Sequence, residues 1–175
     1  RKLRAEHPVG ETDSEHAFCW MLEQLRAAFP GGYPRDVRSL WKTIAELGGE
    51  LGDEGKFNFL LADGRHLYAR CGTKLCYIAR KAPFGRATLS DAELQIDFAA
   101  FTKPRDRVAV VATVPLTRDE VWTQGTPGSM WVFRGGHLRA TLKSGSPVDF
   151  GAGPENPVET PPARSNDDVE KSSRS

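Results

Sequence analysis

The stretch Val9-Gly10-Glu11-Thr12-Asp13-Ser14-Glu15-His16-Ala17-Phe18-Cys19-Trp20 sets an acidic, hydroxyl-bearing loop directly against the start of an apolar-faced helix. Thr12, followed three residues later by Glu15, matches the capping box, in which each side chain accepts a hydrogen bond from the backbone of the other residue. Asp13 then falls in the first helical turn, where the helix dipole favours a carboxylate. The pattern predicts a helix beginning at Asp13, with the Asp13 carboxylate able to point outward at a cationic group.

Apolar periodicity predicts two consecutive helices. From Asp13 to Phe29, apolar residues recur at steps of three and four, and the Pro-Gly-Gly segment at 30–32 ends the helix. A second helix is expected to open near Pro34, a residue suited to the first helical turn. It carries an apolar face as far as Leu51, is weakened by two glycines at 48–49, and ends in the segment 52–55.

After Gly55 the periodicity changes to that of strands, and hairpin signals occur at Asp63-Gly64 and at Gly135-Gly136. The strongly apolar run from Val108 to Val114 predicts a central strand. Two helices followed by about six mostly antiparallel strands indicate an α+β fold. The strand segments are expected at 57–61, 66–71, 75–80, 94–97, 108–114, 130–134 and 137–142.

Composition separates a folded domain from a tail. Residues 151–175 contain few apolar side chains among many prolines and polar residues, so they cannot bury enough surface to offset their ordering entropy. We therefore expect a domain at 1–145 and a disordered tail at 146–175. The net charge of +1 argues against a nucleic-acid partner. No apolar run reaches the length of a membrane span and no signal-peptide core is present, so we expect a cytoplasmic protein without a membrane partner.

The three cysteines, Cys19, Cys71 and Cys76, lack the paired spacing of a disulfide framework, and we expect buried, reduced thiols. A zinc site formed by His7, His16 and Cys19 would have no recognised ligand spacing. We therefore predict neither a metal site nor a cofactor.

Other polar residues are interpreted as structural or solvated. His66 and His137 flank tight turns and are expected at the surface, and Asp63 is interpreted as a turn residue. Arg80-Lys81 is expected to be a solvated strand end. A solvated acidic patch is expected from Asp91, Glu93 and Asp97.

Three motifs resemble one enzyme family. The segment Gly10-Glu11-Thr12-Asp13-Ser14-Glu15 resembles the glutamine-site loop of the class II, or amino-terminal nucleophile, glutamine amidotransferases. The segments Phe57-Asn58-Phe59-Leu60-Leu61-Ala62-Asp63-Gly64-Arg65 and Ala82-Pro83-Phe84-Gly85 resemble later strands of its compact single-domain bacterial members. The resemblance extends from about His7 to about Leu138.

The resemblance implies a four-layer αββα sandwich, an amino-terminal nucleophile hydrolase-like fold with two antiparallel sheets between two helix layers. In this family the nucleophile is an amino-terminal cysteine whose own α-amine acts as the base. An Asn-Gly pair supplies oxyanion donors, and a following arginine binds the substrate carboxylate. The chain opens with Arg1 and contains no Asn-Gly dipeptide. We therefore interpret it as the carboxy-terminal part of the domain, inactive alone, and assign it no catalytic residue.

The resemblance assigns substrate binding to Asp13, which matches the family's aspartate for the α-ammonium of glutamine or of a γ-glutamyl group. A carboxylate in a shielded pocket suits that task because charge-assisted hydrogen bonds are strong. Thr12 matches the adjacent position. The implied partners are glutamine or a γ-glutamyl small molecule and, since no synthase domain follows, a separate ammonia-accepting enzyme. The alternative is a non-catalytic ligand-binding or interaction module derived from this fold.

Overall fold

The computed structural model describes residues 3, 7–91, 95–97 and 103–143. These residues form two helices followed by nine strands, so the α+β class predicted from the sequence is confirmed. The strands at Arg86–Thr88 and Thr123–Gln124 lie outside the expected segments. The helices are α1 (Asp13–Ala28) and α2 (Val37–Glu54). The strands are β1 (Phe59–Ala62), β2 (Leu67–Arg70), β3 (Cys76–Lys81), β4 (Arg86–Thr88), β5 (Gln95–Asp97), β6 (Arg107–Ala112), β7 (Thr123–Gln124), β8 (Ser129–Arg134) and β9 (His137–Lys143).

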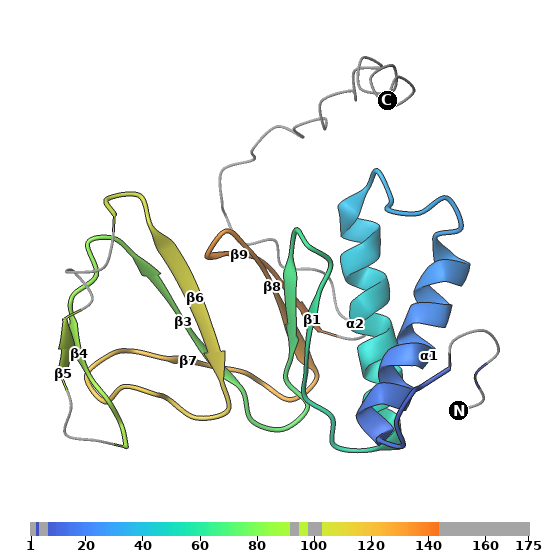
Figure 1. The fold of residues 1–175 in the computed structure, drawn as a ribbon, viewed down its shortest axis with the longest axis horizontal. Helices are drawn as coiled ribbons and strands as arrows, with labels where there is room; N and C mark the ends of the chain where they lie inside the picture. The colour runs from blue at the N-terminus through green and yellow to red at the C-terminus, as the bar shows by residue number, and fades with distance from the viewer. Residues whose placement is uncertain (1–2, 4–6, 92–94, 98–102, 144–175) are drawn as a thin grey trace, which may run out of the picture.

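The strands form three antiparallel sheets. A four-stranded sheet has the order β1-β2-β8-β9, a three-stranded sheet has the order β6-β3-β7, and β4 pairs with β5. Figure 1 shows the two helices on one side of the four-stranded sheet and the three-stranded sheet on its other side. The described residues therefore stack as helices, sheet and sheet. The predicted segment 146–175 and residue Glu93 lie outside the described part of the chain.

The four-stranded sheet is buried on both faces. In β8, Met130 and Val132 are at most 1% exposed and join the core shared with α1 and α2, whereas Trp131 and Phe133 face the core between the two sheets. A register irregularity between Val132 and Phe133 allows neighbouring β9 to contribute to both cores. β8 is thus buried on both faces, as is β2 through Tyr68 and Ala69. The prediction that 108–114 is central was wrong, because β6 lies at the edge of its sheet among the described residues.

The first helix agrees with its prediction to within one residue, and the second ends within the predicted segment 52–55 but begins later than the expected Pro34. Helix α2 begins at Val37 because the Asp36 side chain accepts a hydrogen bond from the Arg38 backbone N–H at 3.1 Å, which makes Asp36 the N-cap. The helix then continues through Gly48 to Glu54, beyond the glycines that were expected to weaken it.

Those glycines make room for a buried arginine. Arg70, at the end of β2, is only 5% exposed and packs against the face of α2 that carries Gly48 and Gly52. A Cβ atom would lie 2.5 Å from Arg70 Cδ if added at Gly48, and 2.4 Å from Arg70 Nη2 if added at Gly52. The low helix propensity of the two glycines is therefore offset by the close approach of the helix to the sheet.

We predict that Gly48→Ala lowers the free energy of unfolding by about 1–3 kcal/mol, the usual range for overpacking. In a helix without such an obstruction, the same substitution would instead raise the free energy of unfolding by up to about 1 kcal/mol. Chemical denaturation of the variant and of the Gly31→Ala control measures the effect, since a Cβ at Gly31 meets nothing within 4 Å. Equal stability of Gly48→Ala and the wild-type protein would contradict the packing argument.

Candidate functional site

The loop that precedes α1 is closed by Glu15. Thr12 Oγ1 accepts a hydrogen bond from the Glu15 backbone N–H at 3.2 Å, so the predicted N-cap is confirmed. The reciprocal half of the capping box was predicted wrongly. The Glu15 carboxylate instead accepts from the backbone N–H groups of Val9 at 2.6 Å and Gly10 at 2.8 Å. The chain can fold back this closely because residue 10 is glycine, where a Cβ would lie 2.7 Å from Glu15 Oε2.

Asp13 lies at the tip of this loop, in the first turn of α1, and it is exposed. Its Oδ1 atom accepts a hydrogen bond from the Ser14 backbone N–H at 2.8 Å. Its Oδ2 atom accepts none from the described residues. The carboxylate is therefore oriented by its own helix and keeps one oxygen available for a ligand. The described residues do not provide the shielded surroundings that were expected for it.

The capping role of Thr12 can be tested separately from the role of Asp13. Thr12→Ala should lower the free energy of unfolding by about 1 kcal/mol, because the Glu15 N–H loses its acceptor. Thr12→Ser retains the hydroxyl and should recover most of this loss in the same urea titration. Equal losses in the two variants would show that the methyl group, rather than the cap, is responsible.

A polar cluster that the sequence did not reveal lies at the β1–β2 turn. Asp63 accepts hydrogen bonds from the hydroxyls of Tyr68 at 2.6 Å and Tyr33 at 3.2 Å, and from the backbone N–H groups of Arg65 at 2.8 Å and His66 at 2.6 Å. The Nδ1 atom of His66 lies 3.3 Å from Asp63 Oδ2. These contacts lower the pKa of Asp63 although burial acts in the opposite direction. Asp63 therefore ties the α1–α2 loop, through Tyr33, to the sheet.

His66 is buried, with 6% exposure, so its predicted surface position was wrong. Its ring makes an edge-on contact with Trp41 of α2, with 5.4 Å between ring centroids. Burial lowers the pKa of His66, although the neighbouring Asp63 carboxylate acts in the opposite direction. The folded state therefore favours the neutral imidazole, which suits a structural position better than a proton-transfer role near neutral pH.

The lowered pKa predicts a pH-dependent stability. As the pH falls below the ordinary histidine value of 6.5, the unfolded chain takes up a proton that the folded chain resists. The stability contribution of His66 is complete above that value and is lost as the pH falls through the pKa of the folded state. Urea unfolding at about pH 7.5 and about pH 5 should show a smaller stability loss in His66→Gln than in the wild-type protein. An identical loss in both proteins would contradict this account.

A second network holds the loop between β6 and β7. Arg80 forms a two-pronged ion pair with Glu120, whose second oxygen also accepts from the Thr117 hydroxyl at 2.6 Å. The indole N–H of Trp122 donates to the Thr117 hydroxyl at 2.9 Å. The hydrogen bonds from Arg80 are the main cause of the lowered pKa of Glu120. Arg80 is thus a partly buried anchor and was wrongly predicted to be a solvated strand end.

The cysteine prediction is confirmed, since Cys19, Cys71 and Cys76 are buried and free. Burial raises the pKa of the Cys71 and Cys76 thiols, so neither is an activated nucleophile. Across the described segments, no group of three or more histidine, cysteine, aspartate or glutamate side chains is arranged to hold a metal ion. Neither described helix combines the length and the apolar character needed to cross a membrane.

Sequence similarity relates the chain to a known protein family. The family described as "Glutamine amidotransferases class-II" matches residues 1–152. The Escherichia coli protein named "Putative glutamine amidotransferase YafJ" is 49% identical over 126 residues, which cover 72% of this chain and 49% of that protein. A Haemophilus influenzae protein with the name "Putative glutamine amidotransferase" is 40% identical over 135 residues, covering 77% of this chain and 45% of that protein.

A solved structure is similar as well. The 2.0 Å crystal structure of a predicted glutamine amidotransferase from Pseudomonas aeruginosa superposes with a TM-score of 0.65 at 43% sequence identity, covering 78% of this chain and 56% of that chain. The architecture is therefore an α+β fold shared with a protein of that description. The chain belongs to the class II glutamine amidotransferase family, as the sequence motifs indicated. It spans about half the length of the curated relatives that it matches.

Proposed function

We propose that the full-length protein is a class II glutamine amidotransferase that hydrolyses the γ-amide of glutamine or of a γ-glutamyl amide. The family membership of this chain supports the proposal. In that reaction the thiol of an amino-terminal cysteine gives its proton to the cysteine's own α-amine and the sulfur attacks the amide carbon. The leaving nitrogen takes up that proton and departs as ammonia from glutamine, or as the amine from a γ-glutamyl amide, and water then cleaves the thioester to release the carboxylic acid and the thiol. The contribution proposed for the residues of this chain is to bind and orient the substrate.

Asp13 is the proposed ligand of the substrate α-ammonium group. The observation that carries this assignment is its available Oδ2 atom beside an Oδ1 atom held by the Ser14 N–H. A fixed carboxylate binds an ammonium group by charge-assisted hydrogen bonds. Thr12 acts beside it by capping α1 and thereby holding Asp13 in position. Because Asp13 is exposed among the described residues, shielding would come from the remainder of the full-length protein.

A fourth layer would complete the fold. We propose that the helix layer and the two sheets of the described residues are three of the four layers of the αββα sandwich. Apolar side chains on β3 and β6, with Trp122, form a third cluster beyond the core between the sheets, and this cluster would pack against the fourth layer.

The ammonia released would pass to a separate acceptor enzyme, or leave the protein if the reaction is simple hydrolysis.

The test measures glutamate release from glutamine by the full-length protein and by its Asp13→Ala variant. We expect KM to rise by about tenfold to a hundredfold with a much smaller change in kcat, because the ammonium contact exists in both the ground and transition states. The matched control is Glu11→Gln, which removes an exposed carboxylate from the same loop.

Unchanged kinetics in Asp13→Ala would remove Asp13 from the substrate site. An absence of glutaminase and γ-glutamyl amidase activity in the wild-type protein would instead support the non-catalytic binding module.

A further inference from the structure

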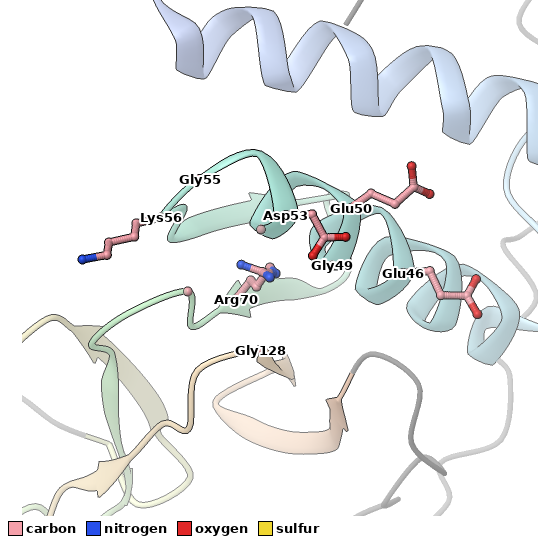
Figure 2. Close-up of a pocket in the computed structure, with 10 residues that line it drawn as sticks. Glu46, Gly49, Glu50, Asp53, Gly55, Lys56, Arg70 and Gly128 are labelled. Atoms are coloured by element: carbon pink, nitrogen blue, oxygen red, sulfur yellow. The ribbon is translucent and has the colours of Figure 1, made fainter.

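A cavity of about 670 Å³ opens beside the C-terminal end of α2, distant in sequence from Asp13. Its walls come from α2, from the segment between α2 and β1, and from the loops that follow β2 and precede β8, and they include Asp53, Lys56, Arg70 and Gly72. Figure 2 shows these elements around the cavity, with Arg70 beneath the last turn of α2. The volume lies in the range of about 300–1,000 Å³ typical of small-molecule sites.

Arg70 brings a buried positive charge to this cavity. Its Nη1 atom donates to the Phe57 carbonyl at 2.9 Å. Its Nε and Nη2 atoms donate no hydrogen bond to the described residues, and no described carboxylate lies within ion-pair distance. Burial lowers the pKa of Arg70, and the through-space attraction of Asp53 only partly opposes this effect. Arg70 is only 5% exposed as a residue and has no direct counter-ion among the described residues, which is costly for a charged group, and a ligand carboxylate would relieve that cost.

The carboxylates around the cavity restrict which anions fit. Asp53 attracts Arg70 through space without forming an ion pair with it. The other charged lining residues, Glu46, Glu50 and Lys56, extend away from Arg70 (Figure 2). An inorganic phosphate or a dicarboxylate would meet Arg70 but would also be repelled by Asp53. A ligand that carries both charges avoids this conflict, because its carboxylate faces Arg70 while its ammonium faces Asp53. Arg70 and Asp53 line the same cavity, so one small ligand that carries both charges can reach both side chains.

We propose that this cavity is a binding site for a free α-amino acid, with Arg70 as the carboxylate ligand and Asp53 as the ammonium ligand. Asp13 is not among the residues that line the cavity. Gly48 and Gly52 admit the Arg70 side chain to this position, since a Cβ at either residue would overlap it.

The experiment is calorimetric titration of the full-length Asp13→Ala protein, in which the contribution of the proposed substrate site is weakened. The probes are free glycine, β-alanine and γ-aminobutyrate, whose charges lie progressively further apart, with propionate and ethylamine as singly charged controls. We expect saturable binding with glycine tightest. Asp53→Asn should weaken glycine binding about tenfold and strengthen propionate binding, whereas Arg70→Met should abolish both. The matched control is Glu54→Gln, which changes a neighbouring exposed α2 carboxylate that does not line the cavity.

Because Arg70 is buried, Arg70→Met can destabilise the fold. Asp53 is exposed, so Asp53→Asn tests the proposal without that complication. Absence of saturable binding by all three amino acids would overturn the proposal. Propionate binding as tightly as glycine would overturn it in favour of a simple anion site. Glycine binding that Asp53→Asn leaves unchanged would overturn it in favour of a binding site elsewhere on the protein.

Discussion

The structure depends on the burial of both faces of the four-stranded sheet. Side chains alternate along β8, so Met130 and Val132 pack against the helices while Trp131 and Phe133 pack against the second sheet. Each large apolar side chain that is fully buried contributes about 1.5–3 kcal/mol before entropy is counted. Because successive residues serve different cores, a one-residue slip of β8 would exchange both sets of contacts. This constraint fixes the register of the sheet and therefore the position at which both helices pack on it (Figure 1).

Hydrogen bonds and an ion pair hold the loops against this core. Asn58 accepts hydrogen bonds from the backbone N–H groups of Gly72 at 2.7 Å and Thr73 at 3.0 Å, which fixes the β2–β3 turn. Asp63 performs the same task for the α1–α2 loop, and the Arg80–Glu120 pair does so for the loop before β7. Buried polar groups of this kind rigidify a structure when they are fully hydrogen-bonded. The loops around the sheet edges are therefore held by side chains rather than by strand pairing.

Local sequence signals predicted the parts of the fold that local interactions determine. Thr12 marks the start of α1 because its hydroxyl needs only the Glu15 N–H three residues away, and Gly135-Gly136 marks the β8–β9 hairpin through backbone conformations with positive φ. The burial of His66 and Arg70 was not predictable in this way. Each is placed by helix α2, whose position relative to the sheet is a long-range property. The edge position of β6 likewise follows from sheet order, which apolar content alone does not specify.

The Asp13 loop was found from its resemblance to a family motif, and its orientation follows from the cap at Thr12 and the closure by Glu15. The central claim is that Asp13 binds the substrate ammonium group. A crystal structure of the full-length protein with bound glutamate tests it most directly. The account predicts an Asp13 carboxylate oxygen within about 3.2 Å of the glutamate α-nitrogen. Glutamate bound with its α-nitrogen on other residues, and Asp13 facing solvent, would contradict it.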